Sequence, residues 1–307
     1  MGDGVARTAA LAEADDTFDQ AEACGARIVL QDEEEYPPTL LELHDPPPAL
    51  FCVGDQTLLS APSAAIVGTR RATPYGERVT RELAGSLARS GVVIVSGLAR
   101  GVDVTAHRAT LDAGGRTVAV LGTGVDIAYP RAHRAIQTTI AEHGLVISEE
   151  PPGSRAKTSS FPKRNRIIAA ITQATIVVEA PLRSGALITA EHATDLHRTV
   201  AAVPGPVDSP QSAGANLLLR DGAHVIASVD DALALLGVSS PRAPAPQPRT
   251  LAERSILDAL SSGPADLDSL AALSGLPARD CMAAVTTLEL RGAVRCDLTG
   301  EVRRMGR

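Results

Sequence analysis

Three cations are packed into the stretch SSFPKRNRIIAA, which runs from residue 159 to residue 170 of a chain of 307 residues. Lys163, Arg164 and Arg166 follow closely after Phe161, and an apolar run suited to a helix comes next. Cationic side chains bind phosphate oxygens and an aromatic ring can stack on a nucleobase, a combination typical of single-strand nucleic-acid binding. Cations at a helix N-terminus oppose the helix dipole, which favours an anionic ligand there. The alternative is a polar helix start in which Phe161 packs as a hydrophobic plug.

The net charge of −7 is unevenly distributed along the chain. Residues 11–45 hold eleven acids and one base, Arg27, whereas outside this segment 28 Lys and Arg residues stand against 25 Asp and Glu residues. The acidity of the whole chain therefore does not argue against an anionic partner for the remainder.

The cysteine spacing, the lengths of the apolar runs and the N-terminal sequence together predict where in the cell the protein is found. The four cysteines are scattered without the paired spacing of a metal or redox site, which predicts reduced, structural thiols. No apolar run reaches the roughly 18 residues of a membrane-spanning helix. The N-terminus lacks the apolar core of a secretory signal. We expect a cytoplasmic protein that does not contact the membrane.

Glycine-rich turns follow several apolar runs and offer further anion sites. They are VGTR (67–70), SGLARG (96–101), LGTG (121–124) and RSGALIT (183–189). Backbone N–H groups at such a turn, with a helix dipole behind them, bind phosphate. Each turn alone is weak evidence, because glycine is common wherever a strand leads into a helix. Four of them, two with an adjacent arginine (Arg70 and Arg100), are more specific.

Catalytic motifs are missing from the chain. There is no P-loop, no HExxH and no GxSxG, and the GTG turn lacks the third glycine of a dinucleotide fingerprint. The seven histidines show no spacing typical of a metal site or a catalytic triad. We therefore expect no catalytic residue, no metal and no cofactor.

Strands and helices that alternate along residues 46–237 would position these turns. The strand candidates are 64–67, 92–95, 117–121, 145–148, 175–179, 199–203 and 223–226. They are apolar throughout, as strands are when a parallel sheet is covered on both faces, and helix-length segments separate them. This alternation predicts an α/β fold with a doubly wound, mostly parallel sheet, whose ligands bind beyond the carboxyl ends of the strands.

The chain divides into four predicted segments. Residues 1–45 form an acidic N-terminal segment or a truncated helical domain, and 46–237 form the α/β domain. Residues 238–250 contain four prolines and predict a linker. Residues 251–307 predict three helices and a hairpin, which is a small winged-helix domain. That domain holds seven bases and eight acids, which suits a protein contact or an accessory role better than reading duplex DNA.

Six long blocks in this order resemble the DNA-processing protein A (DprA, also called Smf) family of bacteria. They include IVGTRRATPYG, VSGLARGVDVTAHRATLDAGGRTVAVLGTGVDIAYP, FPKRNRIIAAITQATIVVEA and SGALITAEHATDLHRTVAAVPG, and the resemblance covers roughly residues 36–235. It implies an extended Rossmann-like domain that binds single-stranded DNA without catalysis. It further implies protection of incoming strands in natural transformation, loading of the RecA recombinase and a homodimer. Residues 1–35 look too short for the complete N-terminal helical domain of many members.

The resemblance and the turns together define a predicted single-strand interface. The resemblance points to Arg70, Arg100, the FPKRNR block and the pair Ser184 and Gly185. The full predicted set is Gly68, Arg70, Arg71, Ser96, Gly97, Arg100, Gly122, Phe161, Lys163, Arg164, Asn165, Arg166, Ser184 and Gly185.

A second function remains open at this stage, that of an enzyme acting on nucleoside monophosphates. Related Rossmann-like phosphoribohydrolases carry a PGGxGTxxE motif at the equivalent strand end. Here PLRSGALITAE (181–191) contains Pro, Gly, Thr and Glu, but not at that spacing. Release of a free base from a nucleoside monophosphate would support this alternative.

Overall fold

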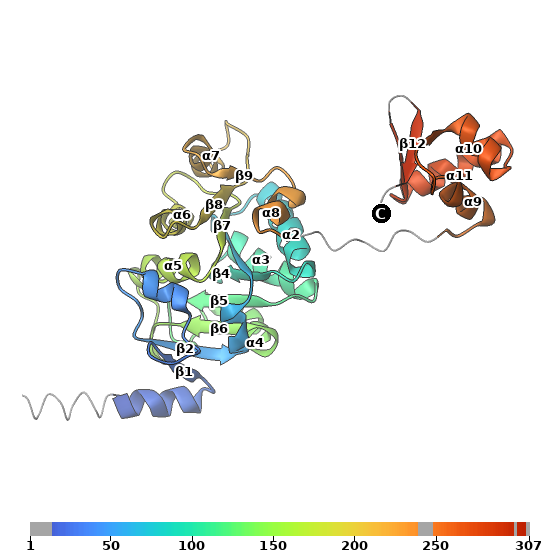
Figure 1. The fold of residues 1–307 in the computed structure, drawn as a ribbon. Helices are drawn as coiled ribbons and strands as arrows, with labels where there is room; N and C mark the ends of the chain where they lie inside the picture. Colours follow the sequence, from blue (N-terminus) through green and yellow to red (C-terminus); the bar gives the residue numbers. More distant parts are fainter. Residues whose placement is uncertain (1–13, 239–247, 298–299, 305–307) are drawn as a thin grey trace, which may run out of the picture. The chain divides into compact units, whose positions relative to one another are not determined.

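The computed structural model describes residues 14–238, 248–297 and 300–304, and the chain forms two compact units, 1–240 and 241–307. The start of the predicted acidic segment (1–13) and most of the predicted linker (239–247) lie outside the described residues. Figure 1 shows a sheet with helices on both faces in the first unit and a small helical unit with a hairpin in the second.

A nine-stranded sheet forms the centre of the first unit. Its strands are β1 (Arg27–Leu30), β2 (Ala49–Gly54), β3 (Ser63–Val67), β4 (Val93–Ser96), β5 (Thr117–Leu121), β6 (Leu145–Ser148), β7 (Ala174–Val177), β8 (Thr199–Ala202) and β9 (His224–Val225). Their order across the sheet is β1-β2-β6-β5-β4-β3-β7-β8-β9. The seven strands from β6 to β9 in this order are parallel, and β2 and β1 are added antiparallel at the β6 edge. The predicted doubly wound, mostly parallel sheet is confirmed.

Helices cover both faces of this sheet (Figure 1). One face carries α2 (Pro74–Arg89), α3 (Val102–Asp112), α4 (Arg134–His143) and α8 (Val229–Leu235), and the other α5 (Ser160–Ala170), α6 (Gly185–Asp195) and α7 (Ala213–Arg220). Short 3-10 turns are η1 (Pro38–Glu42), η2 (Gln56–Ser60) and η3 (Arg131–His133). Within β3, Ala64 and Ile66 pack toward α2 and α3, whereas Ala65 and Val67 pack toward α5 and α6. Both faces of each strand are buried in this way, which explains the continuous apolar runs.

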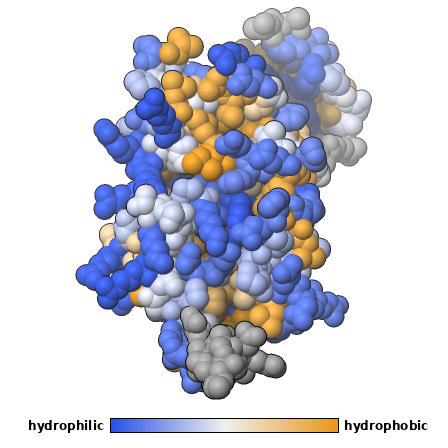
Figure 2. Space-filling view, turned by 90° about the vertical axis from the view of Figure 1, so that its left-hand side faces the viewer, coloured by the Kyte–Doolittle hydropathy of each residue, from blue (hydrophilic) through white to orange (hydrophobic). Residues whose placement is uncertain are grey.

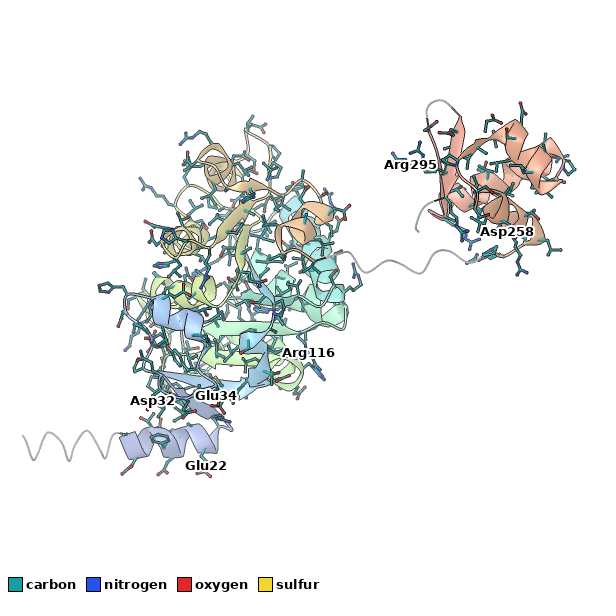
Figure 3. All side chains as sticks on the ribbon, in the orientation of Figure 1. Glu22, Asp32, Glu34, Arg116, Asp258 and Arg295 are labelled. Atoms are coloured by element: carbon teal, nitrogen blue, oxygen red, sulfur yellow. The ribbon has the colours of Figure 1, made fainter. Side chains whose placement is uncertain are left out.

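The structure differs from the predicted boundary near residue 45. β1 pairs with β2, and β2 pairs with β6, so this part of the acidic segment belongs to the main sheet. A helix over residues 14–23 precedes β1, and its Ala21 joins the core cluster that contains Phe51. Burial of Val29 fixes β1, while acidic side chains such as Glu22, Asp32 and Glu34 are exposed around it (Figure 3).

The second unit is a winged helix, as predicted. Its elements are α9 (Leu251–Ala259), β10 (Ala265–Asp266), α10 (Leu267–Ser274), α11 (Ala278–Leu290), β11 (Val294–Cys296) and β12 (Glu301–Arg304). The three strands pair in the order β10-β12-β11. Gly275 ends α10 in the left-handed region, at φ 68°, and allows the turn into α11. Ile256, Leu270 and Leu288 come from the three helices and form the centre of a separate small core.

Polar and charged side chains dominate the face of the molecule seen in Figure 2, with apolar groups gathered mainly in its upper part. Within the described ranges, none of the helices has the length and apolar character needed to cross a membrane. Within the same ranges, no three His, Cys, Asp or Glu side chains are grouped so that they could hold a metal ion.

Candidate nucleic-acid interface

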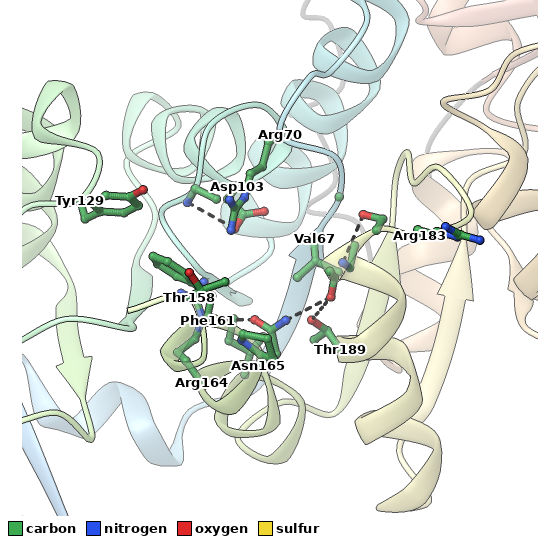
Figure 4. A pocket seen from close by; sticks show the side chains of 17 residues that line it. Val67, Arg70, Asp103, Tyr129, Thr158, Phe161, Arg164, Asn165, Arg183 and Thr189 are labelled. Carbon is green, nitrogen blue, oxygen red and sulfur yellow. Dashed lines mark hydrogen bonds between the residues drawn. The ribbon is translucent and has the colours of Figure 1, made fainter. Parts of the chain in front are cut away.

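A cavity of about 510 Å³ opens beyond the carboxyl ends of β3 and β7. The chain leaves β3 toward β4 on one side and returns to β7 on the other, and such a switch point leaves a crevice at the strand ends. In Figure 4, Arg70 and Asp103 lie above the cavity, Phe161, Arg164 and Asn165 lie below it, and Tyr129 and Arg183 lie toward opposite ends. The lining residues are Val67, Gly68, Arg70, Ala99, Asp103, Tyr129, Thr158, Phe161, Pro162, Arg164, Asn165, Ile168, Arg183, Ser184, Gly185, Ala186 and Thr189.

Glu179, just after β7, fixes the loop that carries Arg70. Its carboxylate accepts hydrogen bonds from the Thr73 hydroxyl at 2.6 Å and from the Thr73 backbone N–H at 2.9 Å. Its backbone carbonyl accepts from the N–H of Thr69 at 2.6 Å. Glu179 is only 2% exposed, so these three bonds anchor both ends of the 69–73 loop to the sheet from within. Arg70 and Arg71 therefore project from an anchored loop.

The turn between β4 and α3 is joined to the same loop. The Val102 N–H donates to the Thr69 carbonyl at 3.2 Å. Gly101 has a φ of 75° and lies so close to Thr69 that a side chain there would collide with the Thr69 carbonyl. Buried Leu98 also adopts a positive φ, 56°, an uncommon conformation for a residue with a side chain. This joint places Arg100 beside the Arg70 loop.

Arg164 lies in the floor of the cavity rather than at its mouth. It is 6% exposed, and its guanidinium donates to the carbonyls of Gly97, at 2.7 Å, and Val120. A side chain on Gly97 would collide with this guanidinium, so glycine is required there. Burial lowers the pKa of Arg164 to about 10, and nearby Asp103 acts in the opposite direction. Arg164 therefore ties the ends of β4 and β5 together.

Asp103 and His107 of α3 lie deeper still. Burial raises the pKa of Asp103, and the charges of Arg164 and Arg70 partly offset this effect. Burial lowers the pKa of His107 to about 3, so its ring is neutral near pH 7. The Thr117 hydroxyl donates to the Ile94 carbonyl, so it must accept the proton of His107 Nδ1, which lies 2.7 Å away. Asp103 belongs to the cavity wall, whereas His107 does not line the cavity and supports α3 from inside the fold.

Lys163 and Arg166 both turn toward Glu149. Arg166 lies 2.7 Å from the Glu149 carboxylate and is 8% exposed, and the Lys163 ammonium lies 3.2 Å from the same oxygen. Neither residue lines the cavity. The dense positive charge of the FPKRNR stretch is therefore largely neutralised within the fold, because α5 presents these side chains to the end of β6.

At this edge of the sheet, four arginines are exposed and lack a carboxylate partner. Arg70, Arg71, Arg100 and Arg183 have no Asp or Glu oxygen within 4.0 Å anywhere in the described parts of the chain. Arg70 and Arg183 line the cavity, and Arg71 and Arg100 lie on the two joined turns beside it. The unneutralised positive charge at this edge comes from the turns after β3, β4 and β7.

An aromatic pair and a polar floor complete the cavity. The rings of Tyr129 and Phe161 lie 5.2 Å apart, and the Arg70 guanidinium lies 5.3 Å from the centre of the Phe161 ring. On the opposite side, Asn165 donates from Nδ2 to the Gly185 carbonyl at 3.1 Å. Ser184 caps α6 by accepting from the Ala186 N–H at 3.3 Å.

The predicted interface residues therefore separate into three groups. Gly68, Arg70, Phe161, Arg164, Asn165, Ser184 and Gly185 line the cavity, and Arg71 and Arg100 flank it. Lys163 and Arg166 point elsewhere. Ser96, Gly97 and Gly122 are buried in the walls, where the Ser96 hydroxyl donates to the Ile66 carbonyl at 2.7 Å.

The predicted set lacked three lining residues that carry a charge or an aromatic ring. They are Asp103, Tyr129 and Arg183. Arg183 is part of the RSGALIT turn, which the sequence already indicated as an anion site. Tyr129 could have been noticed because aromatic residues are rare in this chain, which has three tyrosines and no tryptophan. Asp103 carries no signal of its own, since an acid in the first turn of a helix is common.

Comparison with known proteins identifies relatives along most of the chain. Residues 27–237 match the family model described as DNA recombination-mediator protein A, and residues 240–297 match that of the DprA winged helix domain. A Mycobacterium tuberculosis relative that carries the name DprA is 41% identical over 293 residues, which are 89% of this chain and 75% of that protein.

Two solved structures resemble this one closely. The X-ray structure of DprA from Streptococcus pneumoniae has a TM-score of 0.66 and 41% identity, and the match covers 68% of this chain and 74% of that one. The Helicobacter pylori DNA processing protein A, solved for its single-stranded DNA binding mode, has a TM-score of 0.62 and 35% identity, with coverage of 68% and 95%.

Proposed function

Because the chain belongs to the DNA recombination-mediator protein A (DprA/Smf) family, we propose that it binds single-stranded DNA along the carboxyl edge of its main sheet. The observation that carries the proposal is the group of exposed arginines without carboxylate partners, placed around a cavity that contains an aromatic pair. Phosphates and unpaired bases are the two groups that this combination recognises. The cavity, at the switch point of the sheet, is where the fold class binds its ligands.

We assign the phosphate contacts to the arginines of the three turns. Arg70, Arg71, Arg100 and Arg183 are exposed and unneutralised, so a strand that follows the edge meets one cation after another. Backbone and amide groups of the floor, at Gly68, Asn165, Ser184 and Gly185, would hold the strand between them. Lys163 is half exposed at the start of α5 and can reach a strand at the rim, whereas buried Arg164 and Arg166 support the site from below.

The proposed function contains no catalytic step. Among the described residues that line the cavity, the one carboxyl group belongs to Asp103, which is 6% exposed and accepts a hydrogen bond from the Ala99 N–H at 3.4 Å. A hydrolase acting on nucleoside monophosphates needs an accessible acid or base beside the bond that breaks. The buried position of Asp103 disfavours that alternative.

Family membership leads to further proposals about the cellular role. We propose that the protein protects incoming single strands in the cytoplasm during natural transformation. We also propose that it acts as a homodimer and passes the strands to the RecA recombinase. The test of these roles is co-purification with RecA and strand-exchange assays with strands pre-bound by this protein.

The central test is a titration of single- and double-stranded oligonucleotides at two salt concentrations. Single strands should bind more tightly, and each phosphate contact should contribute about −0.7 to the slope of log K against log salt. Arg70→Ala and Arg183→Ala should each make the slope less negative by about 0.7. Arg89→Ala is the matched control, because Arg89 is exposed at the far end of α2. Wild-type slopes in both cavity variants would refute the assignment, and release of free base would favour the enzymatic alternative.

A further inference from the structure

Tyr129 holds a position that the proposed DNA contacts leave unexplained. It lies between β5 and η3, and it lines the cavity although it is 46% exposed. Aromatic rings are few in this chain, which has three tyrosines, three phenylalanines and no tryptophan, and only Phe18 and Tyr129 among these six described residues are exposed. Tyr36 is buried and donates to the Pro47 carbonyl, and Tyr75 donates to the Pro204 carbonyl. Tyr129 is therefore the most accessible tyrosine of the three, which all lie in the described ranges.

Phe161, the aromatic residue that composition singled out, is enclosed by its neighbours. The Arg70 guanidinium lies over its ring at 5.3 Å from the ring centre. Tyr129 lies beside it with a ring separation of 5.2 Å and a tilt of 33°. A β-carbon at Gly122 would lie 3.2 Å from the edge of the Phe161 ring, so the backbone of that turn borders the third side. A base that stacked on Phe161 would have to displace one of these groups.

We propose that Tyr129 is the base-stacking platform of the cavity, with Phe161 as the ring that supports it from inside. The inference rests on the proposed single-strand function and adds a residue to it. A tyrosine ring presents a large flat face at a small cost in conformational entropy, because it has only two side-chain torsions. Phe161 fixes the orientation of Tyr129 through the ring contact. Arg131 and Arg134, which follow Tyr129 in the sequence, are exposed. They can bind the phosphates next to a base that is stacked on Tyr129.

Intrinsic tyrosine fluorescence provides a direct test, because the protein contains no tryptophan. Titration of the full chain with an oligothymidylate should quench tyrosine emission, since a base stacked on Tyr129 contacts the most accessible of the three tyrosine rings. Tyr129→Phe keeps the aromatic face and should bind within about twofold of wild type, but without this quench. Tyr75→Phe is the matched control and should keep both affinity and quench.

A second variant separates stacking from simple packing. Tyr129→Leu fills most of the space beside Phe161 but has no aromatic face, and it should weaken binding by about 5- to 150-fold. The salt slope should stay at the wild-type value, because no phosphate contact is removed. Wild-type affinity in Tyr129→Leu, or a retained quench in Tyr129→Phe, would overturn the inference and leave the proposed function standing. A wild-type protein that binds no oligonucleotide would remove both.

Discussion

Replacement of Arg164 by methionine tests whether a residue in a basic motif serves the fold or the ligand. The substitution keeps the aliphatic part of the side chain and removes the guanidinium. Two buried carbonyls, those of Gly97 and Val120, lose their donor, and Asp103 loses the cation that most strongly opposes the rise in its pKa. We therefore expect Arg164→Met to act mainly on the stability of the first unit.

The size of the effect follows from these contacts. Hydrogen bonds from a charged donor contribute about 1.5–3 kcal/mol each. Arg164 donates two such bonds to buried carbonyls, so we expect the free energy of unfolding to fall by about 3–6 kcal/mol in total. This is a large part of the about 5–15 kcal/mol that stabilises a typical domain.

Urea denaturation followed by tyrosine emission is the appropriate assay. All three tyrosines lie in the first unit, so the signal reports its unfolding and not that of the winged helix. With a slope of about 1–3 kcal/mol per molar urea, the midpoint should fall by about 1 M or more. Arg70→Met is the matched control, because Arg70 is exposed and loses only a contact with Phe161 worth about 0.5–1 kcal/mol.

The same two variants give opposite results in DNA binding. Arg70→Met should make the salt slope less negative by about 0.7, whereas Arg164→Met, assayed where it is still folded, should keep the wild-type slope. If Arg164→Met unfolds at the wild-type urea midpoint and instead reduces the salt slope, Arg164 contacts phosphate. A structural role for Arg164 would then be refuted.

Two further substitutions test the groups beneath the site. Glu179→Gln keeps the size of the side chain but replaces one of the two carboxylate oxygens that accept from Thr73 with an NH₂ group, which cannot accept. The free energy of unfolding should therefore fall by about 1–3 kcal/mol. Single-strand affinity should fall as well, because the loop that carries Arg70 loses an anchor. Wild-type stability in urea would refute the anchoring role. Below about pH 6.5 the unfolded chain binds a proton at His107, whereas the folded chain does not bind it until about pH 3. The free energy of unfolding of the wild type should therefore fall by about 1.4 kcal/mol for each pH unit below 6.5. His107→Gln removes the titrating ring and should not show this part of the pH dependence. An equal pH dependence of unfolding in both proteins between pH 6.5 and 4.5 would contradict the neutral, buried ring.

The central sheet was predictable because burial on two faces leaves a clear pattern. Runs such as TVAVL at β5 are buried at every position, since each side chain packs under a helix. β1 (RIVL) and β2 (ALFCVG) also contain apolar runs, but short 3-10 turns and not helix-length segments separate them from each other and from β3. β1 lies at the sheet edge among acidic residues, and β2 follows a proline run. The pairing of β2 with β6, which brings β1 into the sheet, depends on contacts distant in sequence.

The exposed arginines of the site were predictable, because their place in the turns after strand ends is enough to expose them. Arg70 and Arg100 follow strand ends, and turns at that edge of a parallel sheet face the ligand. The roles of Arg164 and Arg166 were not predictable, because they depend on what lies opposite. Arg166 meets Glu149, which is 17 residues away in sequence, and Arg164 meets carbonyls of two other strands. A count of charges cannot distinguish a cation that faces solvent from one that is neutralised inside.

The anchored loop after β3 has a consequence for the kinetics of the proposed DNA binding. Glu179 holds residues 69–73 and Gly101 locks the neighbouring turn against them, so the arginines of both turns are preorganised before a strand arrives. Association then requires little ordering of the protein, and the encounter rate is set by electrostatic attraction. The association rate constant should therefore fall steeply with added salt, while the dissociation rate reports the contacts formed inside the cavity.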